Sequence, residues 1–323
     1  MTDTIDRSGC PRVFDAGLPP VDYLSALHPD EAHDIIRQVR QRSPIALGAF
    51  GPEVLSYDLV RTILRDDRFR IPEGMFLAAQ GITSGPLWER VATNLISLDG
   101  EEHHRLRRLI CTAFTPRAVE RMRSTAAQVI NDLLDQQMPQ GHCDVVADIA
   151  RSYPIPVICG LLGAPPQDWP LFSDWADDIL KAFNWNAAAD TPVILAAWAE
   201  LDAYIDEMVA HRRHTLTDDL LSELIRIEDD GDRLTADELR MLVAGLLLAG
   251  TDTTRNQLAA SLHMLLDHPD QWALLTGDPG LVGQAVEETL RYAPIAASTV
   301  RVAVADAELA GVVIPAGTIV LVN

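Results

Sequence analysis

The stretch Leu246–Thr254, LLLAGTDTT, lies in the middle of a long apolar segment with the pattern of a helix. It sets Gly250 and the run Thr251–Thr254 inside that helix, although glycine and threonine weaken a helix interior. A threonine hydroxyl can donate a hydrogen bond to the carbonyl one turn earlier and bend the helix. An acid and an alcohol there form a polar notch in an apolar wall. The notch favours a ligand site or a proton route, and a kink packed against a neighbouring helix is the structural alternative.

The helix that carries this notch is expected to be long enough to cross a whole domain. Thr235 and Glu238 have the spacing of a capping box, and the segment continues to about His268. At the usual rise per residue its length would be roughly 50 Å. Periodicity and cap signals predict further helices at Asp58–Asp66, Glu101–Cys111, Pro116–Gln136, Pro156–Leu162, Asp168–Phe183, Val193–His211, Asp218–Glu228 and Leu281–Tyr292.

Short β-type runs stand towards both ends of the chain. Pro44–Tyr57 indicates two strands around a turn at Phe50–Pro52, and Arg70–Leu95 is expected to be a long loop with about one helical turn. Further strands are expected at Ser298–Ala303, Glu308–Val313 and Thr318–Val322. The predicted fold class is therefore mainly α with a small β portion. Since the chain has no repeat and no long linker, residues 1–323 are expected to form a single domain.

Composition and charge restrict the class of protein. Hydrophobic residues make up 48% and charged residues 23% of the 323 residues, which is typical of a globular protein with an ample core. The formal net charge of −21 argues against nucleic acid as a partner. The N-terminus lacks the apolar core of a signal peptide, and the apolar stretch Leu242–Ala249 is too short to span a bilayer. We therefore expect a cytoplasmic protein with no membrane partner.

Several common kinds of site find no support in the sequence. Four widely separated cysteines, without a CxxC pair, indicate neither a zinc site nor a disulfide framework. The pair His103–His104 and the run His211–His214 lack carboxylate or cysteine partners at zinc spacing. The glycine-rich dinucleotide motif, the phosphate-binding loop and the GxSxG elbow are all missing.

Two charged pairs lie at helical spacing. Glu288 and Arg291, at i and i+3, are typical of a solvated surface pair, although apolar neighbours would also allow a partly buried pair that joins helix to loop. His103 and Arg107, at i and i+4, could hold one anion together, and a charged surface helix is the alternative.

These features occur together, in order and at the spacing of one family. Ala249–Thr254, then Glu288–Arg291, then Arg301, then IPAGT at Ile314–Thr318 resemble the cytochromes P450. The similarity runs from about Pro44 to Asn323.

The helix with His103 and Arg107 resembles that of the bacterial soluble branch, where it opens with Asp-Pro-Pro. Here Gly100 and Glu101 replace the two prolines. Matching stretches also occur at Pro156–Pro165 and Asp218–Leu239.

The resemblance implies a haem-dependent monooxygenase. His103, Arg107 and Arg301 would bind the two propionates of haem b, since cationic donors suit carboxylates. Asp252 and Thr253 would be the acid–alcohol pair that delivers protons to dioxygen.

The same resemblance assigns four smaller parts of the site. Ala249 and Gly250 would form a thin wall beside the haem. Glu288 and Arg291 would form a structural ion pair. Leu248, Ala297 and the loop Ile71–Leu95 would line a pocket for an apolar small molecule. Electrons would come from NAD(P)H through a reductase and a ferredoxin or flavodoxin.

The sequence departs from the family at its C-terminal end. The cysteine whose thiolate holds the haem iron is expected in a glycine-rich loop beyond Asn323, so this chain is expected to hold no metal ligand of its own and to be inactive without that loop. The chain would then be a C-terminally truncated monooxygenase. The alternative is a non-catalytic haem-binding or small-ligand-binding protein. The intact oxygen-handling residues favour the monooxygenase, whereas a helical binding protein without haem leaves Asp252 and Thr253 unexplained.

Overall fold

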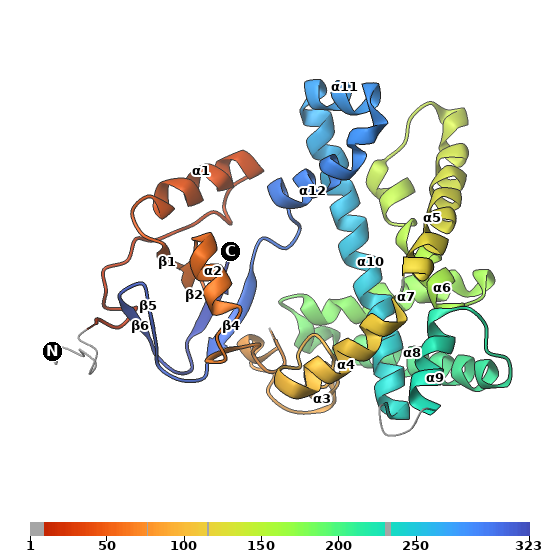
Figure 1. Ribbon diagram of the computed structural model, residues 1–323, viewed down its shortest axis with the longest axis horizontal. Helices are drawn as coiled ribbons and strands as arrows, with labels where there is room; N and C mark the ends of the chain where they lie inside the picture. The colour runs from red at the N-terminus through yellow and green to blue at the C-terminus, as the bar shows by residue number, and fades with distance from the viewer. Residues whose placement is uncertain (1–9, 76, 115, 230–233) are drawn as a thin grey trace. The chain divides into compact units, whose positions relative to one another are not determined.

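The computed structural model describes residues 10–75, 77–114, 116–229 and 234–323 (Figure 1). The chain divides into two compact units, one of Met1–Pro72 with Glu287–Asn323 and one of Glu73–Val286. A single domain over residues 1–323, as expected from the sequence, would contain both units and stays a prediction.

The larger unit is built from helices. In chain order they are η1 (Ala78–Gln80), α3 (Pro86–Ala92), α4 (Gly100–Ala113), α5 (Pro116–Gln137), η2 (Met138–Gln140), η3 (Val145–Ala150, a π-helix), α6 (Pro154–Leu162), η4 (Pro166–Asp168), α7 (Trp169–Ile179), η5 (Leu180–Phe183), α8 (Ala187–His214), α9 (Leu220–Asp229), α10 (Ala236–Asp267), α11 (Pro269–Gly277) and η6 (Pro279–Leu281). The next helix, α12 (Val282–Tyr292), crosses into the smaller unit.

Helix α10 is the long helix predicted from the sequence, and it is continuous over 32 residues (Figure 1). Its N-terminus has the predicted capping box, because the Thr235 hydroxyl accepts from the Glu238 N–H at 3.2 Å and the Glu238 carboxylate accepts from the Thr235 N–H at 2.7 Å. It packs against η3, α6, α7, α8 and α9. The buried side chains of its N-terminal half join the largest apolar cluster of the chain.

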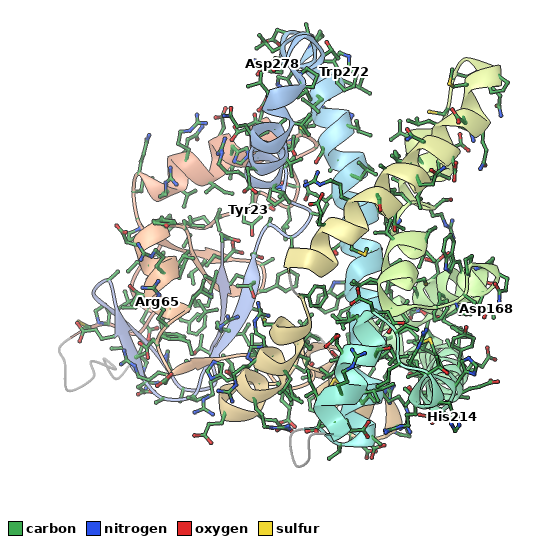
Figure 2. The ribbon with its side chains drawn as sticks, turned by 45° about the vertical axis from the view of Figure 1, so that its right-hand side comes forward. Tyr23, Arg65, Asp168, His214, Trp272 and Asp278 are labelled. Carbon is green, nitrogen blue, oxygen red and sulfur yellow. The ribbon has the colours of Figure 1, made fainter. Side chains whose placement is uncertain are left out.

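The aromatic side chains of α7 and α8 complete that cluster. Phe172 and Trp175 of α7 lie edge-on with ring centroids 5.4 Å apart. Tyr204 of α8 donates a hydrogen bond to the Asp168 carboxylate at 2.6 Å (Asp168 is labelled in Figure 2). These contacts fix α7 on α8, so that both helices form one wall against α10.

The smaller unit combines two helices with short strands. Its elements are α1 (Pro29–Arg40), β1 (Ile45–Gly48), β2 (Gly51–Val54), α2 (Tyr57–Ile63), β3 (Phe69–Arg70), β4 (Thr299–Ala303), β5 (Ala307–Leu309), β6 (Val312–Ile314) and β7 (Ile319–Val322). Five strands form a sheet in the order β1-β2-β7-β4-β3, in which β2 and β7 are parallel and the other neighbours antiparallel. The sheet therefore joins strands from both ends of the chain. Strands β5 and β6 form a separate hairpin.

The predicted fold class is confirmed, and most predicted elements are present within a few residues of their expected ends. Helix α8 begins six residues before Val193, because the Gln80 side chain accepts from the Ala187 N–H at 3.1 Å and supplies one of the missing partners of the helix N-terminus. Glu308–Val313 was expected to be one strand, which is wrong. The chain reverses at Ala310 and Gly311, where φ is 49° and 79°.

The α-helices α1 and α11 and the π-helix η3 were missing from the prediction. Helix α1 has acidic residues in its first turn and basic ones in its last, a signal that was present but not used. Helix α10 ends at Asp267 and helix α11 starts at Pro269, so that His268 is both the C-cap of α10 and the N-cap of α11. The loop expected at Arg70–Leu95 contains η1 and α3.

One stretch, Val145–Leu162, is long and apolar enough by length and composition to cross a membrane. It consists of two separate pieces, η3 and α6, and both pack against α10. Core helices of water-soluble proteins pass the same test, so the stretch is weak evidence for a membrane span.

The sheet contains a buried acid, Glu53. Glu53 of β2 is 1% exposed, and its carboxylate accepts from the Asn323 side-chain amide at 3.0 Å. The Tyr23 hydroxyl donates to the same amide group at 2.9 Å (Tyr23 is labelled in Figure 2). Burial raises the pKa of Glu53, and burial together with the charge of Glu53 raises the pKa of Tyr23 to about 12.

The raised pKa of Glu53 predicts a pH-dependent stability. Because the folded state binds this proton more tightly than the unfolded state, the favourable contribution is complete below the ordinary pKa and is lost as the pH rises through the raised value. Glu53→Gln keeps the hydrogen bonds and should be at least as stable as the native protein at pH 7. Urea unfolding at pH 5 and pH 7.5 measures the difference. An equal difference at both pH values would contradict the prediction.

Candidate functional site

The polar notch of α10 keeps its helical hydrogen bonds. The Thr251 hydroxyl donates to the Leu247 carbonyl at 2.7 Å and the Thr253 hydroxyl to the Ala249 carbonyl at 2.7 Å, as the sequence suggested. Thr251 is 1% exposed, whereas Thr253 and Ala249 are both exposed. Since positions four apart share a helix face, Ala249 and Thr253 form an open patch in the middle of α10, next to the exposed Thr254.

Gly250 faces the other way, towards α6. A Cβ atom built on Gly250 would lie 3.0 Å from Cγ1 and Cδ1 of Ile158. The missing side chain therefore permits the close approach of α6 and α10. That Ala249 and Gly250 form a thin wall beside the cofactor stays a prediction. Leu248, the expected pocket residue, is 9% exposed within the apolar cluster.

Asp252 belongs to a charged cluster on the side of α10 that faces α7. The Asp252 carboxylate accepts from Nε and Nη2 of Arg255 at 3.0 and 2.9 Å. Nη1 of Arg255 donates to the Asp177 carboxylate at 2.7 Å, and Arg151 donates to the same carboxylate at 2.6 Å. Burial raises the pKa of Asp177, but the hydrogen bonds from Arg255 and Arg151 outweigh it and hold the pKa below the usual value.

The sequence prediction missed these partners of Asp252. The spacing of Asp252 and Arg255 was a usable signal, since i and i+3 residues meet on a helix. The contact with Asp177 had no local signal, because it depends on how α7 packs against α10.

His103 and Arg107 lie one turn apart on α4. The helix begins at Gly100, where the Asp99 carboxylate accepts from the Gly100 N–H at 2.7 Å. His103 is half-buried and Arg107 exposed. Desolvation, then the charges of Arg107 and His104, lower the pKa of His103, so its imidazole is mainly neutral at pH 7.

The neighbouring Arg105 has a structural contact. It forms an ion pair with Glu238 of the capping box and so joins α4 to the N-terminus of α10. Among the described residues, no carboxylate forms an ion pair with Arg107. The pair His103 and Arg107 thus offers one neutral N–H donor and one cation on the same helix.

The remaining predicted residues belong to the smaller unit. Arg301 of β4 is half-buried and donates to the Val300 carbonyl at 2.8 Å. Ala297 is exposed just before β4. Glu288 and Arg291 form the predicted ion pair through two contacts of 2.8 and 2.7 Å. Their side chains are 61% and 64% exposed, which matches the solvated alternative, and their structural role stays a prediction.

The segment expected to line the substrate pocket is tied to α8 within the larger unit. Besides the Gln80–Ala187 contact, Arg90 of α3 donates to the Asp202 carboxylate at 2.5 Å. The Arg90 guanidinium also lies 4.1 Å from the centroid of the Trp198 ring, a cation–π distance. The segment is therefore held at two points on one helix.

The smaller unit has a hollow on its surface that does not suit an apolar ligand. It is lined by the mostly charged side chains Asp58, Arg61, Thr62, Arg65, Asp66 and Asp67 (Arg65 is labelled in Figure 2).

The cysteines have differing surroundings. Cys111 and Cys143 are exposed, and Cys10 donates a weak hydrogen bond to Glu308 at 3.4 Å. Burial raises the pKa of the Cys159 thiol to about 12, so this thiol is neutral at pH 7. The described residues contain no group of three His, Cys, Asp or Glu side chains that could hold a metal ion.

Known proteins share this combination of fold and residues. The cytochrome P450 family model matches residues 171–275 and 280–323. The chain is 37% identical over 320 residues to the cytochrome P450 monooxygenase PikC of Streptomyces venezuelae, covering 94% of this chain and 74% of that protein. It is 40% identical over 232 residues to 6-deoxyerythronolide B hydroxylase of Saccharopolyspora erythraea, covering 72% and 56%. The crystal structure of CalO2 superposes with a TM-score of 0.85 at 30% identity, covering 94% of this chain and 77% of CalO2.

Sequence identity at this level over most of the chain defines a haem-dependent oxidoreductase. The chain belongs to the cytochrome P450 family, as its motifs predicted. Its activity is that of a monooxygenase acting on a small molecule, with haem iron as the cofactor.

Proposed function

We propose that the chain binds haem b through His103, Arg107 and Arg301, and that Asp252 and Thr253 deliver protons to dioxygen beside Ala249 and Gly250. The observation that supports this proposal best is the open patch of α10. Thr253 and Ala249 are exposed together in the middle of the longest helix, next to an acid that belongs to a charged cluster. Such a patch suits a flat apolar ring with a polar reaction at one point.

The chemistry of the donor set fits the acidic edge of a haem. His103 offers an N–H donor, and Arg107 and Arg301 offer planar guanidinium groups that suit carboxylates. The lowered pKa of His103 is caused partly by the positive charge of Arg107, so a carboxylate placed beside both would raise that pKa again. On α4, the ion pairs formed among the described residues involve Arg105 and not Arg107, so Arg107 can bind an anion without giving up a described carboxylate partner.

Haem, when bound, supplies the iron at which dioxygen is reduced and one oxygen atom is inserted into the substrate. Asp252 takes protons from solvent, since its side chain is 37% exposed. It passes them to the side of α10 where the Thr253 hydroxyl lies. That hydroxyl donates to the Ala249 carbonyl, and by rotation it can donate into the open patch instead.

The substrate is proposed to be an apolar small molecule, because Leu248 and Ala297 are aliphatic. Electrons are proposed to come from NAD(P)H through a reductase and a ferredoxin or flavodoxin, in the cytoplasm. Glu288 and Arg291 are proposed to serve as a structural pair. The ligand of the iron is proposed to be a cysteine beyond Asn323, as the family resemblance implies; Cys159 is a buried neutral thiol.

The proposed haem contacts predict a selective loss of affinity. Arg107→Gln should weaken haem binding about tenfold, which corresponds to the loss of one charge-assisted hydrogen bond of about 1.4 kcal/mol. Haem titrated into the apoprotein, followed by quenching of tryptophan fluorescence, measures the dissociation constant. Arg108→Gln is the matched control, because Arg108 is an exposed arginine on the same helix. Equal affinities for the two variants would contradict the role of Arg107, and no haem binding by the native protein would contradict the proposal as a whole.

A further inference from the structure

Four charged residues of alternating sign form a chain that ends at Asp252. Arg151, just after η3, binds Asp177 of α7 at 2.6 Å. Asp177 binds Arg255 of α10 at 2.7 Å, and Arg255 binds Asp252 one turn earlier on the same helix at 2.9 Å. The chain of contacts therefore runs from an exposed arginine, through α7, to the acid of the polar notch.

Arg255 is the most enclosed member of this chain. Its side chain is 17% exposed, compared with 26% for Asp177, 37% for Asp252 and 62% for Arg151. One edge of its guanidinium, Nε and Nη2, faces Asp252, and Nη1 faces Asp177. A guanidinium is planar, so fixing one edge on α7 also fixes the direction of the other edge.

Other charged groups lie near this position: Asp178 of α7 forms an ion pair with Lys181, and the charge of Lys181 also interacts with that of Asp177. Of the elements packed against this part of α10, α6 carries no charged side chain. Asp148 of η3 is bonded to the Asp144 N–H at 2.8 Å. Arg255 therefore contacts the Asp252 carboxylate directly, and Asp177 and Arg151 are connected to Asp252 through Arg255.

A pair at i and i+3 on one exposed helix face is mobile and contributes little. The contact with Asp177 changes this, because Arg255 can no longer swing away from α10 without losing a second carboxylate. Because Arg255 also pairs with Asp177, its positive charge attracts two carboxylates, and its attraction for Asp252 is weaker than it would be for Asp252 alone. An acid in a proton path has to be held in place and yet be able to gain and lose a proton.

We propose that Arg255 and Asp177 are positioning residues of the proton path. Arg255 holds the Asp252 carboxylate on the α7 side of the helix. Asp177 fixes the position of Arg255 and weakens the attraction between Arg255 and Asp252. This inference rests on the proposed role of Asp252 in proton delivery. The alternative is that the four residues only join α7 to α10.

The two roles differ in what happens to the proton affinity of Asp252. If the proposal is right, Arg255→Gln raises that affinity about tenfold or more, because the neighbouring cation is lost. Asp177→Asn lowers it, because Arg255 then pairs with Asp252 alone and a nearby negative charge is gone. A merely structural contact would give lower stability in both variants without shifts of opposite sign.

The test is a pH titration of the apoprotein labelled with 13C at the aspartate carboxyl carbons. The Asp252 resonance is identified by its absence in Asp252→Asn. Arg123→Gln is the matched control, because it removes one positive charge from an exposed i,i+3 pair on α5 of the same unit. Arg255→Lys keeps the positive charge, so its Asp252 titration should stay close to that of the native protein. If Arg255→Gln does not fold, Arg255→Lys and Asp177→Asn together provide the test.

Opposite shifts in the two variants support the proposal. Unchanged titration of Asp252, or shifts of the same sign, would overturn it. This readout needs neither haem nor turnover, so it is independent of the proposed function. If the titrations shift as expected but Asp252→Asn leaves monooxygenation unchanged, the positioning stands and the proton-delivery role of Asp252 fails.

Discussion

In the haem-loaded protein whose chain continues through the proposed cysteine ligand, Asp252→Asn is expected to lower the rate of substrate monooxygenation about a hundredfold, the usual size of a general acid–base contribution. Asparagine keeps the size of the side chain and can still accept from Arg255, but it cannot release a proton. Substrate binding should change little, because the Asp252 side chain lies on the α7 side of α10 with Arg255. The loss should therefore appear in kcat, with KM nearly unchanged.

The threonines of the notch give a matched pair for the same reaction. Thr253→Val removes an exposed hydroxyl, whereas Thr251→Val removes a buried one that makes the same type of bond one turn back. The shape of valine is close to that of threonine, so both variants should fold. We expect Thr253→Val to lower kcat about tenfold or more and Thr251→Val to affect mainly the free energy of unfolding, by about 1 kcal/mol. Product formation under steady-state conditions measures both. Equal losses of kcat would argue against a special role for the exposed hydroxyl.

Local sequence signals were sufficient for α10. Its capping box and the hydroxyl bonds of Thr251 and Thr253 involve residues about one turn apart, and its length follows from a pattern along one continuous segment; all are confirmed. The same kind of signal located the strands at both ends of the chain. The hairpin at Ala310 and Gly311 was mistaken for a strand because the reversal needs only two residues and the residues directly after it, Val312–Ile314, are β-branched.

Contacts between distant segments had no such signal. Asp177 reaches Arg255 only because α7 packs on α10, and Gly250 faces Ile158 only because α6 lies against the same helix. The sequence showed that Gly250 is small, but not which neighbour requires it to be small. The roles of His103, Arg107 and Arg301 came from the family resemblance, since charge and spacing alone also fit a surface helix.

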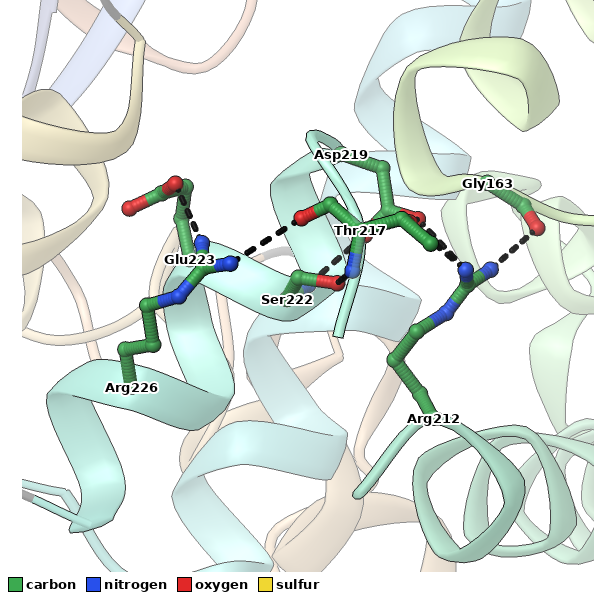
Figure 3. A network of polar contacts seen from close by, with 7 residues as sticks. All are labelled: Gly163, Arg212, Thr217, Asp219, Ser222, Glu223 and Arg226. Atoms are coloured by element: carbon green, nitrogen blue, oxygen red, sulfur yellow. Dashed lines mark hydrogen bonds and ion pairs between the residues drawn. The ribbon is translucent and has the colours of Figure 1, made fainter. Parts of the chain in front are cut away.

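A second large effect is expected in stability, at the point where α6, α8 and α9 meet (Figure 3). Arg212 of α8 donates to the Gly163 carbonyl at 2.8 Å and forms an ion pair with Asp219 at 2.9 Å. Asp219 is the N-cap of α9, and its carboxylate accepts from the Ser222 N–H at 2.7 Å. The Arg212 and Asp219 side chains are only 16% and 10% exposed.

This junction is closely packed, and the Thr217 hydroxyl also donates to the Asp219 carboxylate. Gly163 ends α6 with a φ of 77°, and a Cβ atom there would lie 2.3 Å from Oδ2 of Asp219. The glycine is therefore required both by its backbone conformation and by the closeness of the ion pair. Because the site is fixed from three helices, Asp219 cannot turn to solvent if Arg212 is removed.

Arg212→Met should accordingly lower the free energy of unfolding by about 3 kcal/mol, because it leaves a carboxylate buried without its cation. Arg226→Met is the control, since Arg226 forms an exposed pair with Glu223 on α9 and should cost less than about 1 kcal/mol (Figure 3). Urea unfolding measures both. The double variant Arg212→Met with Asp219→Asn keeps an N-cap but has no buried charge, so it should recover part of the loss. A double variant that is less stable than Arg212→Met alone would show that the cost comes from lost packing around Arg212 and not from the unpaired Asp219 carboxylate.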